Sequence, residues 1–251
     1  MPQRIGEARA VSGKLFGVGT GPGDPELLTL KAVRAIAAAD VVAYFAKRGN
    51  ASNARAIASV HFRPDQIEEA LDYPVTTEID RRENGYKTQI AAFYSEAATR
   101  LAAHLDAGRD VVVLSEGDPL FYGSYMHLHL RLEPSYDTEV VPGITAMSGC
   151  WSEAGLPLVQ GDDILTILPG TLDRDELARR LGNTHGAVIM KLGRNLPKVR
   201  AALADAGRLD QAVYVERGTT AGGFSVALAD KTDDEAPYFS LVLVPGWESR
   251  P

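Results

Sequence analysis

The sequence predicts an α/β protein of two domains, with a parallel sheet in the N-terminal domain and a mixed sheet in the C-terminal one. Short runs rich in Val, Ile and Leu alternate with helical patterns over most of the 251 residues, an order typical of parallel strands joined by helices. Beyond about Gln211 strand patterns follow one another without a helix between them, which favours a mixed sheet. We place the boundary near "VVPGITA", so that the predicted domains are residues 13–143 and 144–251.

The strands are expected where short runs of β-branched, aromatic and other apolar residues occur between turn or charged residues, as in "DVVAYF", "DVVVLS" and "AVIMKL". In chain order these runs are residues 14–19, 40–45, 110–115, 138–141, 164–168, 187–192, 211–216 and 238–244. The helices are expected where apolar residues recur every three or four positions and give the segment one buried face. In chain order these segments are residues 29–39, 86–107, 121–132, 145–154, 174–181 and 196–206.

The charge balance argues against a nucleic-acid partner. Twenty-six Lys and Arg against 33 Asp and Glu give a net charge of −7, the wrong sign for a protein that neutralises a phosphate backbone. A local basic pocket for a small anion is compatible with an acidic surface. The single cysteine, Cys150, excludes an intramolecular disulfide, and no histidine stands in a ligand motif, so we expect no metal site.

We expect a cytoplasmic protein without a membrane partner. No apolar run approaches the roughly 20 residues that a membrane span requires. The opening segment "MPQRIGEARA" has neither the apolar core nor the cleavage site of a signal peptide.

The first predicted strand leads into "GVGTGPGDPELLTLKA", residues 17–32. A Gly-rich turn from a first strand to a first helix is where α/β proteins bind nucleotides. The dinucleotide fingerprint needs Gly at the first, third and sixth positions, but the sixth position here is Pro22, and no Lys-Ser or Lys-Thr pair makes a P-loop. NAD and ATP are therefore poor candidates for the ligand.

Two prolines in the same loop favour a ligand without phosphates. Pro22 and Pro25 fix φ and remove two N–H donors, so the loop is a rigid turn and not a nest of amides. A plain tight connection capped by Asp24 or Thr29 explains the same residues equally well.

Four further strands end in Gly-containing loops, at the edge where open α/β sheets bind ligands. Together the segments "GPGDPELLTLKA", "SEGDP", "VPGITA", "MKLG" and "ERGTT", between about Lys14 and Pro245, resemble the tetrapyrrole methylases. These are the S-adenosylmethionine-dependent methyltransferases of cobalamin and sirohaem synthesis. Within the family, "SEGDPLFYGSYMH", "AYFAKRGNASNARAIA" and "YPVTTEID" are most similar to the members that act on precorrin-2 in the aerobic cobalamin route.

The resemblance implies two α/β domains with S-adenosylmethionine folded into the cleft between them. The activity it implies is methylation of carbon 20 of precorrin-2, which gives precorrin-3A and S-adenosylhomocysteine. Methylation of cobalt-factor II, of another ring position or of a macromolecule, and nonenzymatic binding of the cofactor, are the alternatives. Family members are commonly homodimers, and "GGFSVALAD" and "PYFSLVLVPG" are the possible interface strands.

The resemblance also implies cofactor contacts from both domains. The residues concerned are Pro22, Glu116, Gly117, Asp118, Phe121, Thr145, Ala146, Met190 and Gly218. Three of them have purely structural explanations as well. Asp118 could cap a helix that begins with Pro119, Thr145 could cap the next helix, and Met190 could belong to the core of a buried strand.

The tetrapyrrole implied as substrate carries acetate and propionate groups, which Arg and Lys recognise. Candidates for this contact are Lys47, Arg48, Arg55, Lys191 and Arg217, with Arg81 and Arg82 as further ones. A solvated basic face explains any single one of them equally well. The uroporphyrinogen methylases have an Asp after the Tyr that ends the second strand, where this chain has Phe45 after Tyr44, so no general base is assigned.

Overall fold

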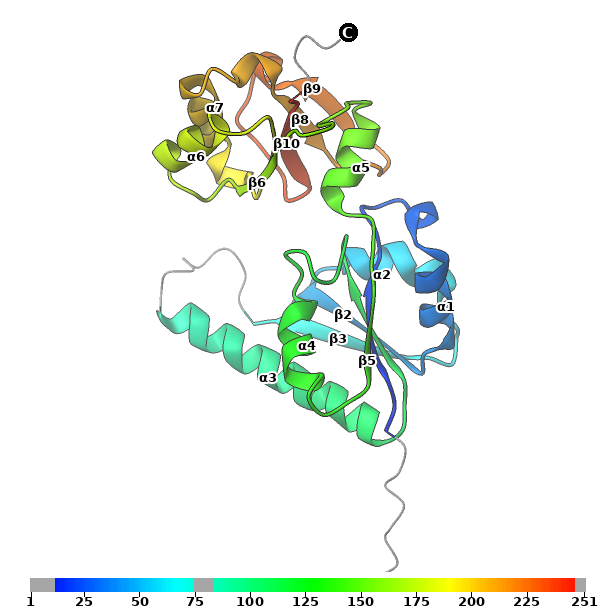
Figure 1. Cartoon of the computed structure of the whole chain (residues 1–251). Helices are drawn as coiled ribbons and strands as arrows, with labels where there is room; N and C mark the ends of the chain where they lie inside the picture. The colour runs from blue at the N-terminus through cyan, green and yellow to red at the C-terminus, as the bar shows by residue number, and fades with distance from the viewer. Residues whose placement is uncertain (1–11, 75–83, 247–251) are drawn as a thin grey trace, which may run out of the picture. The chain divides into compact units, whose positions relative to one another are not determined.

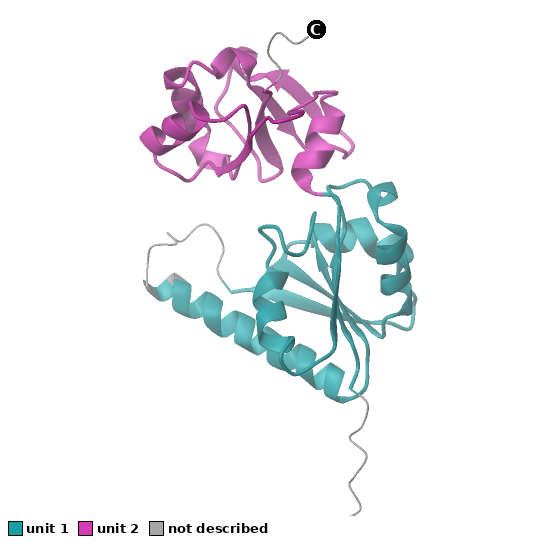
Figure 2. Ribbon diagram, viewed as in Figure 1, with its two compact units in different colours: residues 1–144 teal, residues 145–251 magenta. Residues whose placement is uncertain are grey.

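The computed structural model describes residues 12–74 and 84–246. The chain forms two compact units, Met1–Ile144 and Thr145–Pro251 (Figure 2). Among the residues described, no helix has both the length and the apolar composition needed to cross a bilayer.

Unit 1 is built on a parallel sheet of five strands. These are β1 (Leu15–Gly19), β2 (Val41–Lys47), β3 (Ile67–Tyr73), β4 (Val111–Ser115) and β5 (Thr138–Val141). Their order across the sheet is β3-β2-β4-β1-β5, and every neighbouring pair is parallel. All five carboxyl ends therefore meet at one edge of the sheet.

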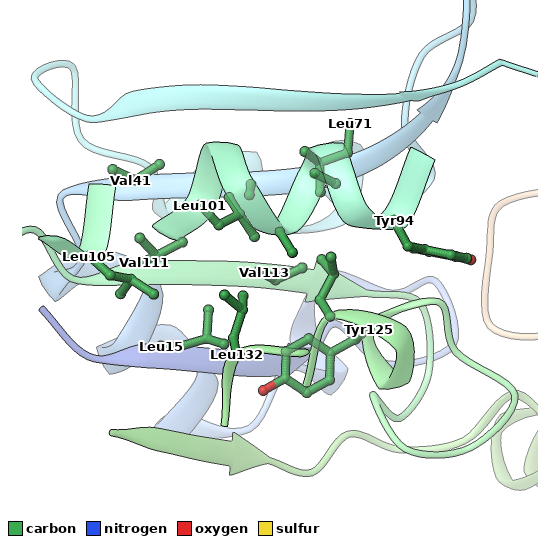
Figure 3. Close-up of a cluster of buried hydrophobic side chains, with 14 of the residues drawn as sticks. Leu15, Val41, Leu71, Tyr94, Leu101, Leu105, Val111, Val113, Tyr125 and Leu132 are labelled. Carbon is green, nitrogen blue, oxygen red and sulfur yellow. The ribbon is translucent and has the colours of Figure 1, made fainter. Parts of the chain in front are cut away.

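Helices cover both faces of this sheet (Figure 1). Helices α1 (Leu30–Ala38) and α2 (Asn53–Ala58) pack on one face, and α3 (Asn84–Asp106) and α4 (Tyr125–Leu132) on the other. Alternate residues of β4 belong to the two cores, so the whole strand is buried and its sequence is continuously apolar. Figure 3 shows the core under α3 and α4, where Leu101 and Leu105 meet Val111.

Unit 2 is built on a mixed sheet. Its strands are β6 (Leu165–Pro169), β7 (Gly186–Met190), β8 (Val213–Glu216), β9 (Phe224–Ala227) and β10 (Ser240–Val244), in the order β6-β7-β10-β8-β9. β6 and β7 are parallel, whereas β10 is antiparallel to β7 and β8. Helix α5 (Ala146–Glu153) packs on one face, and α6 (Arg174–Leu181) and α7 (Leu196–Asp205) on the other.

The predicted fold class is confirmed, because the structure has a parallel sheet in unit 1 and a mixed sheet in unit 2. Each predicted strand is present, with bounds that differ by no more than two residues. The sequence did not predict β3 or α2. β3 is an edge strand whose residues are mostly exposed or half-buried and include two glutamates and an aspartate, so it lacks a strong apolar pattern.

The helix expected at residues 121–132 begins later, at Tyr125. The residues before it form tight turns, in which the Leu120 amide donates to the Asp118 carboxylate and the Phe121 amide donates to the Asp118 carbonyl oxygen. Tyr122 then has a φ of 55°, which no right-handed helix allows.

A glycine in β1 makes room for the core of unit 1. A Cβ on Gly17 would lie 2.2 Å from carbons of the ring of Tyr125, the fully buried first residue of α4. Gly17, the first glycine of the loop motif, is therefore required by packing against Tyr125.

Candidate functional site

The strand order of unit 1 creates a switch point between β4 and β1. The chain leaves β1 toward β2 on one side of the sheet, through α1, and leaves β4 toward β5 on the other side, through α4. The two helices pack on opposite faces. Ligands of open α/β sheets bind at such a point, outside the carboxyl ends of the strands. The loops that carry Pro22 and Glu116 begin there.

Backbone hydrogen bonds join the β1 and β4 loops across this point. The Gly117 amide donates to the Gly21 carbonyl oxygen at 2.9 Å, and the Gly21 amide donates back to Gly117 at 3.3 Å. Thr20, fully buried, donates to the Ser115 carbonyl oxygen from both its amide, at 2.8 Å, and its hydroxyl, at 3.2 Å. No sequence pattern singles out Thr20, because its role depends on a partner 95 residues away.

Glycines of three loops pack directly on one another, and we call Gly19, Gly117 and Gly143 the glycine junction. A Cβ on Gly143 would lie 2.0 Å from the Gly117 carbonyl oxygen, and one on Gly19 would lie 2.5 Å from the same atom. Both distances are far below van der Waals contact. The junction therefore holds the ends of β1, β4 and β5 together, a requirement for glycine that is independent of any ligand.

Asp118 reinforces the junction. Its Oδ2 accepts a hydrogen bond from the Gly143 amide at 3.1 Å and its Oδ1 accepts one from the Leu120 amide at 2.9 Å. The alternative that Asp118 caps a helix starting at Pro119 is wrong, because α4 begins at Tyr125. Thr145 does cap α5, where its hydroxyl accepts from the Ser148 amide at 3.3 Å and Ala146 is the first helical residue.

Glu116, the first residue after β4, is a partly buried carboxyl group. Burial raises its pKa, and a hydrogen bond with Asn53 opposes that shift. Asn53 is the first residue of α2, and Ser52 caps this helix by accepting from the Arg55 amide at 3.3 Å. The cap was the signal in the sequence that would have located α2, and with it Asn53.

Backbone strain is concentrated at the ends of strands. Among the described residues the non-glycine residues with positive φ are Tyr122 at 55°, Lys191 at 58°, Arg217 at 50° and Thr219 at 70°. They follow β4, β7 and β8, whose carboxyl ends carry the motifs "SEGDP", "MKLG" and "ERGTT". Such conformations cost on the order of 1–3 kcal/mol each and cluster at ligand sites.

Unsatisfied hydroxyl groups occur at the same ends. In residues 12–74 and 84–246, the buried side-chain atoms without a hydrogen-bond partner are Ser115 Oγ, at the end of β4, and Thr219 Oγ1, after β8. A buried hydroxyl without a partner costs about 1–3 kcal/mol. Strain and missing partners therefore point to the same loops as the sequence motifs do.

In unit 2, Gly218 fixes the "ERGTT" loop against α5. A Cβ on Gly218 would lie 2.8 Å from the Cys150 Sγ, and burial raises the pKa of the Cys150 thiol to about 11, which makes it an inert packing group. Met190 is half-buried at the end of β7 and packs in the core that includes Cys150. The structural explanation of Met190 as a core residue therefore holds.

The basic candidates differ in their surroundings. Arg55 forms a bidentate pair with Glu68, from its Nε at 2.5 Å and its Nη2 at 2.9 Å, and the pair holds the pKa of the Glu68 carboxyl below its usual range. Lys47, the last residue of β2, and Arg48 are exposed at the carboxyl edge of the sheet. Arg81 and Arg82 lie outside the described residues.

Arg217 lines an open hollow of about 610 Å³ in unit 2. Its Nε lies 3.8 Å from an oxygen of Glu216, which also lines the hollow, as do Lys231 and Asp233. The charge of this hollow is therefore mixed. Lys191 is an exposed residue that directly follows β7.

The chain matches the family of tetrapyrrole (corrin/porphyrin) methylases over residues 14–228. It belongs to this family. It is 67% identical over 239 residues to the precorrin-2 C(20)-methyltransferase of a Sinorhizobium species, covering 95% of this chain and 98% of the relative. It is 27% identical to the cobalt-precorrin-2 C(20)-methyltransferase of Salmonella typhimurium, over 95% of this methylase and 99% of the relative.

A solved structure supports the same fold. The uroporphyrin-III C-methyltransferase of Thermus thermophilus, complexed with S-adenosylhomocysteine, superposes with a TM-score of 0.64 at 25% identity. The match covers 93% of this methylase and 97% of the other chain.

We predict that Asp118→Ala lowers the free energy of unfolding by about 1.5–3 kcal/mol, because it removes a charged acceptor shared by two amides. Asp24→Ala is the matched control. Asp24 also precedes a proline and accepts an exposed hydrogen bond from the amide two residues on, as Asp118 does, but among the described residues no amide of a second loop donates to it. Urea unfolding of both variants measures the difference, and equal losses would show that the Gly143 contact contributes nothing.

We also predict a pH-dependent stability difference between Glu116→Gln and the unaltered protein. Because burial raises the pKa of Glu116 in the folded state, its neutral form contributes stability below the unfolded pKa, and that contribution is lost as pH rises through the folded pKa. Gln stays neutral, so the variant should be the more stable protein at pH 7, with the advantage vanishing near pH 4. Urea titrations across this range measure it. A difference that does not change with pH would contradict the assigned burial.

Proposed function

We propose that this methylase transfers a methyl group from S-adenosylmethionine to carbon 20 of precorrin-2, giving precorrin-3A and S-adenosylhomocysteine. The observation that carries the proposal is the 67% identity with a precorrin-2 C(20)-methyltransferase over nearly the full length of both chains. The metal-free ring is favoured over its cobalt complex, because the identity with the cobalt-precorrin-2 enzyme is 27%.

The loop after β1 suits S-adenosylmethionine. The loop after β1 lacks the features that grip phosphates and is shaped by Pro22, and this cofactor carries no phosphate. We propose that residues of both units contact it. These are Pro22, Glu116, Gly117, Asp118 and Phe121 of unit 1, and Thr145, Ala146, Met190 and Gly218 of unit 2.

The reaction requires little acid–base catalysis by the protein. Carbon 20 attacks the sulfonium methyl group, the new C–C bond forms as the S–CH3 bond breaks, and the electron pair stays on sulfur. The proton on carbon 20 then leaves, to solvent in this proposal, and no residue is assigned as its acceptor. Alignment of carbon, methyl and sulfur is the main contribution, and positioning of this kind supplies on the order of 7–11 kcal/mol.

Cations at the carboxyl edge of unit 1 suit the carboxylates of the substrate. Because Glu68 pairs with Arg55, we propose that Arg48 provides more of the attraction than Arg55 does, and Lys47 is a further candidate beside it. Lys191 and Arg217 are the corresponding candidates in unit 2.

We further propose a homodimer in the cytoplasm. Of the two segments expected at an interface, β10 is central in its sheet and fully buried, so it is unsuited to that role. β9 is an edge strand with an exposed Phe224, and an edge strand has backbone groups available to a second chain.

The test is an anaerobic incubation with precorrin-2 and S-adenosylmethionine labelled with ¹³C in the methyl group, followed by NMR of the tetrapyrrole. We expect one labelled methyl group on carbon 20. Label on another carbon would replace the proposed position. Absence of transfer to precorrin-2, with transfer to cobalt-factor II, would overturn the proposed substrate.

A further inference from the structure

Thr219, in the "ERGTT" loop that follows β8, combines two unfavourable features. Its φ of 70° lies in the left-handed region, where a β-branched residue is rare. Its Oγ1 is buried and has no hydrogen-bond partner among the described residues. In residues 12–74 and 84–246, the remaining non-glycine residues with positive φ and the remaining unpaired buried hydroxyl each have one feature only. Thr219 is therefore the residue at which strain and a missing partner coincide.

Hydrogen bonds on both sides of Thr219 hold it in this conformation. The Arg217 carbonyl oxygen accepts from the Thr220 amide at 3.0 Å and from the Thr220 hydroxyl at 2.8 Å. The Arg217 amide donates to the Phe239 carbonyl oxygen at 2.8 Å, and the Gly223 amide donates to the Thr220 carbonyl oxygen at 2.9 Å. The loop thus fixes the position of the Thr219 hydroxyl without giving it a bond.

Other residues would make the loop more stable in the absence of a ligand. Asn or Gly suits a positive φ better, and Val would keep the branched shape without burying a polar atom. Strained backbone and unsatisfied polar groups that persist in native proteins are frequent at functional sites. A hydroxyl donates one hydrogen bond and has two lone pairs that accept, so a polar ligand can satisfy it.

Thr219 lies at the edge of the unit 2 sheet where other motif loops begin. β7 and β8 are each antiparallel to β10, which lies between them, so these two strands run in the same direction. Their carboxyl ends are therefore at one edge of the sheet. Met190 is the last residue of β7 there, and Thr219 follows Glu216, the last residue of β8.

The chemistry of the loop favours the adenosyl group of the cofactor over the tetrapyrrole as the partner of Thr219. A carboxylate of the tetrapyrrole prefers a cationic donor, and the exposed Arg217 of the same loop is better suited to it. Thr219 instead offers a neutral hydroxyl, next to Gly218, which packs on Cys150 in an apolar core. Adenine nitrogens and ribose hydroxyls are uncharged polar atoms that pair with such a group.

We propose that the Thr219 hydroxyl hydrogen-bonds an uncharged polar atom of the adenosyl group of S-adenosylmethionine, and that this bond forms only when the cofactor binds. The inference deepens the proposed function and rests on its cofactor, not on its tetrapyrrole substrate. It adds a side-chain contact beside Gly218, where the proposed contact is one of backbone.

The test is calorimetric titration with S-adenosylhomocysteine and with methylthioadenosine, which lacks the amino-acid part. Thr219→Val keeps the branched shape and deletes the hydroxyl. Without ligand, we expect it to unfold at the same temperature as the unaltered protein or higher, because no bond is lost. It should bind both ligands about tenfold more weakly, because a polar atom of the ligand then lacks its partner. Thr219→Ser, which keeps the hydroxyl, should bind both within about threefold of the unaltered protein.

Thr220→Val is the matched control, because the Thr220 hydroxyl is bonded within the same loop, to the Arg217 carbonyl oxygen. Without ligand this variant should unfold at a lower temperature than the unaltered protein. Its affinity for both ligands should stay within about threefold. Stability thus falls only in the control, and affinity falls only in Thr219→Val.

Unchanged affinity in Thr219→Val would overturn the inference, as would a lower unfolding temperature without ligand, since the hydroxyl would then have a structural partner. Weaker binding of S-adenosylhomocysteine alone would overturn the assignment to the adenosyl group. Equal weakening in Thr220→Val would overturn it too, because loop shape would then explain the loss.

Methyl transfer to precorrin-2 tests the proposed function separately. If Thr219→Val meets these expectations while the unaltered protein does not methylate precorrin-2, the inference stands and the proposed reaction fails. If the unaltered protein binds neither S-adenosylhomocysteine nor methylthioadenosine, both fail.

Discussion

The contact of the Gly117 carbonyl oxygen with Gly19 and Gly143 is the constraint on which the edge of unit 1 depends. The ends of β1, β4 and β5 are far apart in the chain. Their backbones come into direct contact because Gly19, Gly117 and Gly143 have no Cβ. The Gly21–Gly117 bridge and the Asp118 hydrogen bond to Gly143 follow from that close approach. A side chain at the junction would separate the loops and break both.

In both units, the destabilising features, strained backbone and unpaired buried hydroxyls, lie at the carboxyl ends of strands. Their cores are ordinary, with continuously buried strands such as β4 covered by helices on both faces. In the part of the chain that the structure describes, the non-glycine residues with positive φ and the buried unpaired hydroxyls stand at the ends of β4, β7 and β8. Strained backbone and unpaired buried hydroxyls are destabilising, and they are retained at a ligand site because the bound ligand can offset their free-energy cost.

The sequence predicted the alternation of strands and helices because most of the strands are buried and apolar. β3 was not predicted, because as an edge strand it carries charged residues such as Glu68 and Glu69. The motif loops were recognisable from Gly and Pro after apolar runs. Their internal geometry was not, because a φ of 55° at Tyr122 or a missing partner at Thr219 depends on contacts far along the chain. The same holds for Thr20, whose partner Ser115 becomes a neighbour only when β1 pairs with β4.

The most direct test is the affinity of Gly143→Ala for S-adenosylhomocysteine, measured by calorimetry below its unfolding temperature. Gly85→Ala is the control, because a Cβ there meets no atom of the described residues within 4 Å. We predict that Gly143→Ala loses about 1–3 kcal/mol of stability through overpacking and at least tenfold in affinity, while the control loses neither. A folded Gly143→Ala variant that binds S-adenosylhomocysteine as tightly as the unaltered protein would contradict it, since the glycine junction would then not position the cofactor loops.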